Sequence, residues 1–351
     1  MTDTETRTDE LSFPDVHVPG SGEDPTAETL RREIDEWVSS QAFSGLVAAE
    51  GGQQTGTLAE RLAYLDGFSA SAWDFRARAA RLAKAGYLER NQIAVDEVQG
   101  ERELLAVAAA RALGLVEARP PASTEYDHVL VLGGLVRANV WRSAYAAHLL
   151  HSGRVHAPVV TALTAFRELA RNDAEPALDE PSLLTAFGLP SRGTEAEVME
   201  DSLIRAFGLD SPLTTSVQGG WDDEHGRFRV AAHVSPELSV DLVAAPNPKS
   251  PNRANTGQTM TYWAEEVVHL RPGQTILFVT SNIYVPFQHA AAVQNLGLRF
   301  GARVETVGVD HTLIEPAPMP QTFRGVHYLQ EIRSAVRAYR QLLDVLGSED
   351  D

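Results

Sequence analysis

The residue types best suited to hold a ligand are concentrated in one polar turn, residues 245–255, and in the helix start that follows it. Arginine donates charge-assisted hydrogen bonds, asparagine and threonine cap helix starts, and glycine lets a ligand approach the backbone. The free N–H groups of a helix start also favour an anion. The pattern therefore predicts an anion-binding turn made of Arg253, Asn255, Thr256 and Gly257. The alternative interpretation is that Asn255 and Thr256 only cap the helix.

A glycine pair marks a second candidate site. The apolar run Val129–Leu132 does not alternate, which is typical of a strand buried on both faces, and it ends at Gly133 and Gly134. Helical spacing begins at Asn139, so a strand, a turn and a helix follow one another. N–H groups in such a turn favour an anion, and we expect Gly133, Gly134 and Arg142 to contact a nucleotide-like or phosphorylated molecule. The full G-x-G-x-x-G fingerprint is absent, and a simple tight turn is the alternative.

A third group of polar residues follows the apolar run Thr275–Thr280. Open α/β sheets bind ligands beyond the carboxyl ends of their strands. We therefore expect Ser281, Asn282 and Tyr284 to meet the glycine turn around one ligand.

Three residues are candidates for acid/base chemistry because of their types and positions. Glu195 opens a predicted helix, while Asp310 and His311 end the predicted strand Val304–Val309. We expect all three at the same edge of the sheet. A glutamate in a first helical turn is also favoured by the helix dipole alone, whether or not it touches a ligand.

These candidate sites can meet only if the strands before them lie in one sheet. The hydrophobic pattern between residues 123 and 346 predicts such a sheet. Five strand-like runs alternate with helical ones, which predicts a Rossmann-like α/β domain with a mostly parallel five-stranded sheet and flanking helices. A β-hairpin with a long glycine-rich tip, residues 213–234, looks like an insertion into this domain. The hairpin is either a lid over the site or an excursion on the surface.

The first third of the chain has a different pattern. Residues 1–25 carry prolines and glycines among charged residues, which predicts a flexible tail. Residues 26–118 show about four amphipathic helices and are expected to form an α-helical N-terminal domain. The break at Pro120 and Pro121 reads as the linker to the α/β domain, to which the last helix, Val326–Leu346, is assigned.

The composition of the chain limits the kinds of molecule that it is expected to bind and the place where it is expected to occur. The 351 residues carry 48 acidic and 30 basic side chains, a formal charge of −18, which argues against nucleic-acid and anionic-membrane binding. The chain has no cysteine, and the pair His148 and His151 has no clear third ligand, so no metal site is predicted. The acidic N-terminus lacks the features of a signal peptide and no run is long enough to span a membrane, so a cytoplasmic location is expected. The sequence does not specify an oligomeric state.

Four segments resemble, in order, the motifs of one known family. They are the strand and turn from Asp127 to Gly153, the helix start Thr194–Ala196, the segment Ala254–Thr259 and the strand end Thr280–Pro286. Over residues 125–310 the chain resembles the YdcF-like family, which also includes SanA and ElyC. The resemblance implies S-adenosylmethionine as a candidate cofactor, a nucleotide being the other, and places the chain nearer the soluble branch of the family.

Two classes of function follow. The first is a small-molecule enzyme or cofactor-binding protein, although the sequence contains neither a G-x-S-x-G elbow nor a P-loop. The second is a non-catalytic regulatory or scaffold protein with a degenerate site. Its support is a set of departures from the YdcF-like pattern, at Thr161, Gln258, Tyr284 and Phe287.

Overall fold

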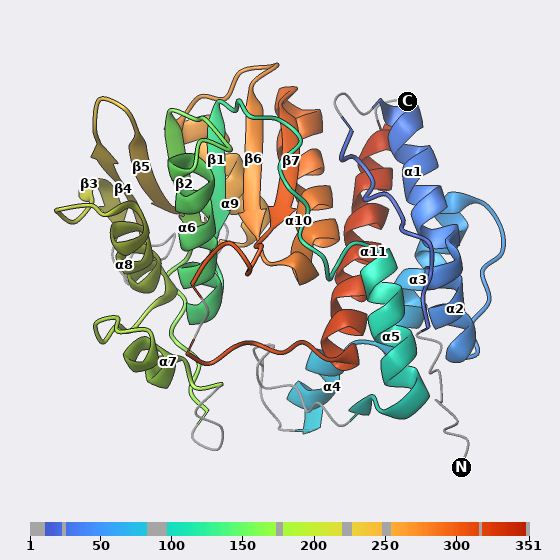
Figure 1. The fold of residues 1–351 in the computed structure, drawn as a ribbon. Helices are drawn as coiled ribbons and strands as arrows, with labels where there is room; N and C mark the ends of the chain where they lie inside the picture. Colours follow the sequence, from blue (N-terminus) through green and yellow to red (C-terminus); the bar gives the residue numbers. More distant parts are fainter. Residues whose placement is uncertain are drawn as a thin grey trace, which may run out of the picture.

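The computed structural model of the chain describes residues 11–22, 26–82, 97–172, 178–219, 227–247, 254–315 and 318–348. A mixed sheet with helices on both faces stands beside a layer of helices (Figure 1). The predicted α/β class with a helical N-terminal region is therefore confirmed. The N-terminal helices of this layer are α1 (Ala27–Ser39), α2 (Gln41–Ala49), α3 (Leu58–Ala72), α4 (Phe75–Leu82) and α5 (Gly100–Ala112).

Five strands of the sheet are parallel and lie in the order β5-β2-β1-β6-β7. They are β1 (His128–Leu132), β2 (Val159–Thr164), β5 (Ser239–Ala244), β6 (Thr275–Thr280) and β7 (Arg303–Gly308). The predicted runs Val129–Leu132, Thr275–Thr280 and Val304–Val309 agree with β1, β6 and β7 to within one residue at each end. From β1 the chain adds β2 and β5 on one side and then returns to add β6 and β7 on the other. The direction of winding therefore reverses beside β1, where open sheets leave a crevice at their carboxyl ends.

Alternate side chains of each strand face opposite layers of helices. Val129 and Val131 of β1 pack into one core with α6 (Val136–His151), α7 (Glu180–Ala186) and α8 (Glu195–Phe207). Leu130 and Leu132 pack into another with α9 (Thr256–Tyr262) and the π-helical segments η3 (Trp263–Val267) and η5 (Val293–Leu298). The two-residue period of β1 thus fixes which helices lie on which face.

The predicted insertion extends the sheet. Its arms are β3 (Thr214–Gly219) and β4 (Phe228–Val234), and residues 229–234 of β4 pair antiparallel with the whole of β5. The guanidinium of Arg229 on β4 binds the carboxylate of Glu200 on α8, with 2.5 Å between Nη1 and Oε2. The sheet therefore has seven strands where five were predicted, and the arms are part of it. The tip, residues 220–226, lies outside the described residues.

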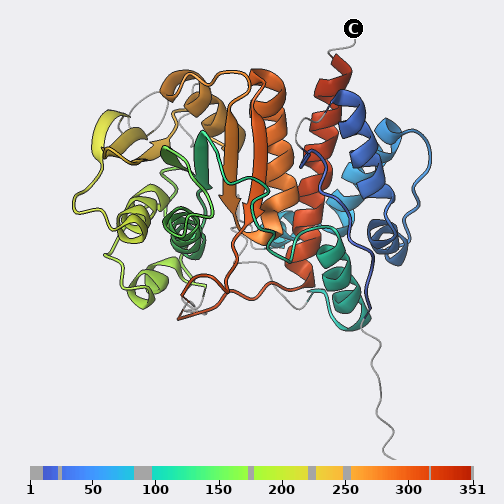
Figure 2. The same ribbon diagram turned by 45° about the horizontal axis from the view of Figure 1, so that its top comes forward.

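The last helix, α11 (Gly325–Ser348), lies in the helical layer and not on the sheet. Its residues Ile332, Val336 and Tyr339 are buried in one apolar core with the N-terminal helices, and the ring of Tyr339 lies 5.1 Å from that of Trp37. Figures 1 and 2 both show α11 between these helices and α10 (Val285–Ala292). The predicted division into residues 26–118 and 123–346 therefore cuts through a single core.

Part of the predicted flexible tail is packed on this layer. The N–H of Val16 donates to the carbonyl of Ala112 at 2.8 Å, and the N–H of Gly20 donates to Oε2 of Glu33 at 2.9 Å. Val18 between them is buried. Residues 11–22 thus belong to the folded structure, while residues 1–10 and 23–25 lie outside the described residues. Throughout the described ranges, no helix combines the length and the apolar character needed to cross a bilayer.

Candidate functional site

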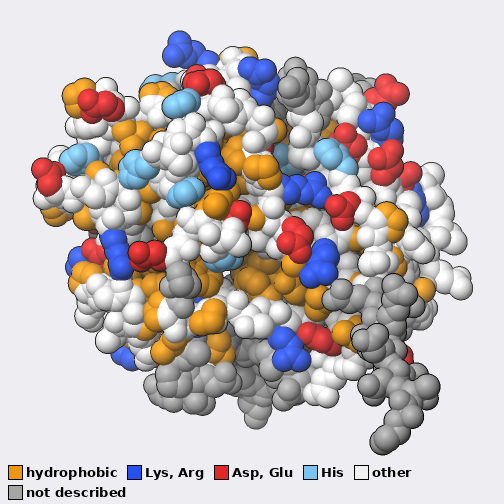
Figure 3. All heavy atoms as spheres, in the orientation of Figure 1, with side chains coloured by type: hydrophobic (Ala, Val, Ile, Leu, Met, Phe, Trp, Pro, Cys, Tyr) orange, Lys and Arg blue, Asp and Glu red, His pale blue; other side chains and the backbone are white. Residues whose placement is uncertain are grey.

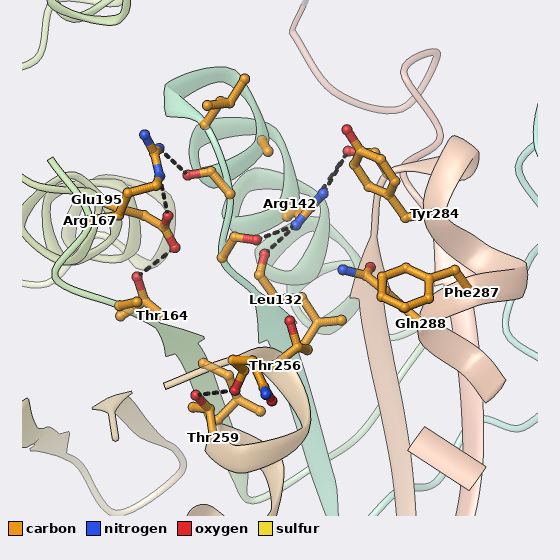
Figure 4. A pocket seen from close by; sticks show the side chains of 18 of the residues that line it. Leu132, Arg142, Thr164, Arg167, Glu195, Thr256, Thr259, Tyr284, Phe287 and Gln288 are labelled. Atoms are coloured by element: carbon orange, nitrogen blue, oxygen red, sulfur yellow. Dashed lines mark hydrogen bonds and ion pairs between the residues drawn. The ribbon is translucent and has the colours of Figure 1, made fainter. Parts of the chain in front are cut away.

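A cavity of about 320 Å³ opens at the carboxyl ends of β1, β2 and β6. We call it the sheet-end cavity. Its walls are the glycine turn after β1, the loop after β2, the starts of α8 and α9, and the η4 (Asn282–Tyr284) and α10 segment after β6 (Figure 4). The face of the molecule drawn in Figure 3 is hollowed near its centre, below these strand ends. Gln321, in the segment that leads to α11, completes the lining.

Arg142 of α6 reaches back under the glycine turn to this cavity. Its Nη1 donates to the carbonyls of Leu132 and Gly133 at 2.6 and 2.8 Å, and its Nε and Nη2 both lie 3.2 Å from the hydroxyl of Ser281. The centre of the guanidinium lies 5.4 Å from the ring centroid of Tyr284, within the range of a cation–π contact. The side chain is 1% exposed. Carbonyl oxygens at the end of β1 and a hydroxyl just after β6 therefore help to hold a positive group in the cavity wall.

A buried ion triad forms the opposite wall. Arg167, in the loop after β2, donates from Nε to Oε2 of Glu195 at 2.9 Å and from Nη1 to Oε2 of Glu180 at 2.7 Å. The second oxygen of Glu195 accepts from the hydroxyl of Thr164 at 3.2 Å. Since Glu195 lines the cavity and Glu180 lies behind Arg167, the cavity faces one carboxylate whose orientation is fixed by its partners.

The glycine turn lines the cavity, but its N–H groups are occupied. The N–H of Gly133 donates to the carbonyl of Leu163 at 2.7 Å, and that of Gly134 donates to Oδ1 of Asn139 at 2.9 Å. The N–H of Val136, in the first turn of α6, donates to Oε1 of Glu180 at 2.9 Å. The expectation that these donors point at an anion is therefore wrong, because a carboxylate of the protein already sits at the start of α6. The positive group offered at this wall is Arg142.

The start of α9 is both a capped helix start and a part of the cavity wall. The side chain of Asn255 accepts from the N–H of Gln258 at 2.9 Å, and the side chain of Gln258 accepts from the N–H of Asn255 at 2.8 Å. This reciprocal capping box explains why the helix begins here. Asn255 and Thr256 also line the sheet-end cavity. Gly257 points elsewhere, since a Cβ on it would lie 3.2 Å from Nδ2 of Asn295, and Arg253 lies outside the described residues.

Some of the residues that follow β6 line the cavity, whereas another of them contacts the helical layer. Ser281 and Tyr284 line the cavity, together with Phe287 and Gln288 of α10. Asn282 turns away, because its Nδ2 donates to the carbonyl of Val116 at 2.9 Å, in the segment after α5. Asn282 thus joins the sheet to the helical layer.

Asp310 and His311 do not line the sheet-end cavity. The chain turns after β7 along the outer side of α6, where the ring of His311 meets that of Trp141 at 4.5 Å. Hydrogen bonds from Thr312 lower the pKa of Asp310, and burial lowers the pKa of His311. The predicted grouping of these two residues with Glu195 is therefore not found.

Comparison with known proteins identifies the family. A family model described as the Rv3785 N-terminal domain matches residues 21–114, which hold helices α1 to α5. The protein Rv3785 of Mycobacterium tuberculosis is 32% identical over 341 residues, which cover 92% of this chain and 91% of that protein. The protein Mb3814 of Mycobacterium bovis matches with the same identity and coverage. The chain belongs to the Rv3785 family. No solved structure gives a significant match.

This membership corrects the resemblance drawn from the sequence. The similarity to the YdcF-like family is wrong, because the matches over nearly the whole chain are to Rv3785 proteins. S-adenosylmethionine was suggested only by that resemblance and loses its support with it. The idea of a degenerate site loses its support too, since Thr161, Gln258, Tyr284 and Phe287 departed from a pattern that does not apply to Rv3785 proteins.

Four side chains at or directly behind the sheet-end cavity of this Rv3785 family member were not predicted from the sequence, namely those of Thr164, Arg167, Glu180 and Gln288. Thr164 is the last residue of β2 and Arg167 lies in the loop after it, so the rule that ligands bind at carboxyl strand ends could have identified both. Glu180 is the first residue of α7, where Asp179 is the N-cap and Pro181 stands in the first turn. An N-cap residue followed by proline is a recognised signal for a helix start.

Proposed function

We propose that this protein binds a small anionic molecule, of the size of a phosphorylated metabolite, in the sheet-end cavity of a Rossmann-like sheet. The observation that carries the proposal is the position of Arg142, whose guanidinium lines a cavity at the point where the strand order reverses. The parallel strands follow the order of the Rossmann type when they are numbered among themselves, and this reversal is where such sheets bind ligands.

An anion is favoured because of how Arg142 is held. Two carbonyl oxygens and a hydroxyl are among its acceptors, and they hold the positively charged guanidinium at the cavity wall. In a buried wall, where water screens little, attraction for a ligand's phosphate or carboxylate is strengthened. The hydroxyl of Ser281 is a further hydrogen-bonding group at the same place. A volume of about 320 Å³ is at the lower end of the range for ligand pockets and suits a compact molecule.

Glu195 supplies the complementary group. Its carboxylate is acceptor-only when ionised, so it favours a hydroxyl or an amine of the ligand. Of the three acid/base candidates, Glu195 is the one that lines the cavity, and we propose it as the group that accepts a proton or a hydrogen bond from the ligand. The proposed ligand thus combines an anionic group near Arg142 with a hydroxyl or amino group near Glu195.

The test is a thermal-shift screen followed by calorimetry with inorganic phosphate, ribose 5-phosphate and nucleoside monophosphates. A ligand present at about 100 times its dissociation constant stabilises the folded state by about 2.7 kcal/mol. Arg142→Lys keeps the charge and loses the planar fork, and we expect it to weaken binding about tenfold. Arg32→Lys, at a largely exposed position of α1, is the matched control and leaves binding unchanged. Absence of a shift with every probe would contradict the proposal.

A further inference from the structure

A second hollow adjoins the sheet-end cavity. It is a groove of about 1120 Å³ between α9 with η3 on one side and α10, η5 and α11 on the other. We call it the amide groove, and its characteristic residues are Tyr262, Glu266, Gln294, Asn295, Gln341 and Asp344. Asn255, Thr256 and Phe287 line both hollows. In Figure 4, Thr256 and Phe287 lie on the α9 and α10 walls of the sheet-end cavity. A ligand that extends past these two side chains enters the groove.

The groove differs chemically from the cavity. The arginine among its described residues, Arg299, is paired with Glu265 at 2.5 Å. Glu266 and Asp344 are exposed carboxylates, and Gln294 and Gln341 add amides to the lining of the same groove. Ionised carboxylates only accept hydrogen bonds, so this surface repels a phosphate and favours a hydrogen-bond donor.

Two aromatic side chains of the groove favour a ligand with a flat ring. Tyr262 stands on the α9 side of the groove and Phe287 on the α10 side. Burial, reinforced by Glu266, raises the pKa of the Tyr262 hydroxyl, so this group stays protonated and polar. Flat rings pack well against aromatic side chains, and amides offer a donor and an acceptor to the edge of such a ring.

We propose that the amide groove is a second subsite of the same binding site and takes a flat, amino-bearing ring. The ligand class is then a nucleoside monophosphate whose base carries an exocyclic amine, with the phosphate near Arg142 and the base between Tyr262 and Phe287. This inference rests on the proposed function, because the phosphate must occupy the sheet-end cavity.

The experiment compares three probes by calorimetry on the full chain, namely adenosine 5′-monophosphate, inosine 5′-monophosphate and ribose 5-phosphate. The first two differ at one edge of the base, where the adenosine compound has an amino group beside an acceptor nitrogen and the inosine compound has a carbonyl oxygen beside an N–H, and the third lacks a base. We expect the adenosine compound to bind about tenfold more tightly than the inosine compound, as one added hydrogen bond to a charged group allows, and at least as much more tightly than ribose 5-phosphate, which also lacks the ring. Glu266→Gln and Asp344→Asn should reduce its advantage over the inosine compound. The matched controls Glu237→Gln and Asp210→Asn change exposed acids outside both hollows and should leave it unchanged.

The outcomes separate the two proposals. Equal affinity for the three probes, with no effect of either groove variant, overturns the second subsite while the sheet-end cavity stands. Tighter binding of the inosine compound overturns the preference for an amine. If none of the three probes binds, the proposed function fails together with the subsite. A preference for the adenosine compound that survives both groove substitutions also overturns the assignment, because the amine is then recognised elsewhere.

Discussion

Gly133 and Glu195 are in direct contact, and a Cβ at position 133 would lie 2.5 Å from Oε1 of Glu195. It would also lie 2.9 Å from the carbonyl oxygen of Leu163. Gly133 is not among the glycines with positive φ, so its backbone conformation is open to any residue. The glycine is therefore required for space, because the end of β1, the end of β2 and the start of α8 converge on it.

Gly133→Ala should destabilise the protein by about 1–3 kcal/mol, the usual cost of overpacking a tight site. Relief by movement is restricted, since Arg167 and Thr164 hold Glu195 in place. The free energy of unfolding in urea measures the effect. Gly67→Ala in the exposed middle of α3, where nothing lies within 4 Å of the added Cβ, is the control and should stabilise slightly. Equal stability of the Gly133→Ala variant and the wild type would show that α8 can shift.

Glu180→Gln should cost about 3 kcal/mol although the side chain keeps its shape. Both oxygens of Glu180 accept hydrogen bonds, Oε1 from the N–H of Val136 and Oε2 from the N–H of Ala170, and each also accepts from Arg167. An amide nitrogen in either place would face donors, so two hydrogen bonds are lost, one of them to a charged group. Urea unfolding gives the cost. Glu36→Gln, which removes a largely exposed partner of Arg32, should change little, and a similar loss in both variants would contradict the argument.

The sheet could be predicted because each of its parallel strands is specified by a short, continuous stretch of sequence. The apolar runs around Val131 and Val279 are buried on both faces, and such runs lack the alternation of exposed strands. The glycine turn, Arg142, Ser281 and Tyr284 were expected at one site and do line one cavity, since carboxyl strand ends of a parallel sheet meet at one edge. These parts depend on short stretches of sequence.

What was missed depends on distant contacts. The direction of the chain after β7, which carries His311 to Trp141, is decided by packing on α6. β4 pairs with β5 because β5 is the outermost parallel strand on that side of the sheet. The sequence of the hairpin does not indicate this partner. The last helix was assigned to the α/β domain, whereas its buried residues pack in one core with helices from the start of the chain.

Stability should fall between pH 6.5 and pH 4 because of His289. This side chain is 1% exposed, its Nδ1 lies 3.0 Å from the hydroxyl of Thr306, and burial lowers its pKa from 6.5 to about 4 despite the nearby Glu33, with His17 also close. The unfolded chain therefore binds a proton at a higher pH than the folded one. The contribution is fully present above pH 6.5 and is lost as the pH falls to 4, by about 3 kcal/mol in total.

Urea unfolding at four pH values between 7 and 4 measures this loss. His289→Gln keeps a group that can meet Thr306 but does not titrate, so its stability should fall less over this range. The difference between the wild type and the variant isolates His289 from the other titrating groups. Parallel curves for the two proteins would show that His289 is not the cause.

A fragment that begins at Ser123 should not fold on its own. It would contain the whole sheet, but α11 would lose the partners that cover Ile332, Val336 and Tyr339. Exposure of one such side chain costs about 1.5–3 kcal/mol, which is comparable with the total stability of a domain once several are exposed. The full chain should unfold in one transition, and the fragment should bind a hydrophobic dye and lack a cooperative transition. A soluble fragment with a sharp transition would restore the division at Pro120 and Pro121.

Substitutions at Ser281 and Asn282, which are adjacent in sequence, should have different effects. The first should weaken ligand binding and the second should lower stability. The Ser281 hydroxyl is 3.2 Å from two nitrogens of Arg142, so Ser281→Ala should loosen the guanidinium and weaken binding of the best phosphate probe up to about tenfold. The amide of Asn282 instead donates to Val116 at 2.9 Å and lies against Gly308. Asn282→Ala should therefore lower the free energy of unfolding by about 1–2 kcal/mol, with affinity unchanged. Calorimetry and urea unfolding on both variants give the two readouts. Weaker binding by the Asn282 variant, with the Ser281 variant unaffected, would move the site to the boundary between the sheet and the helical layer.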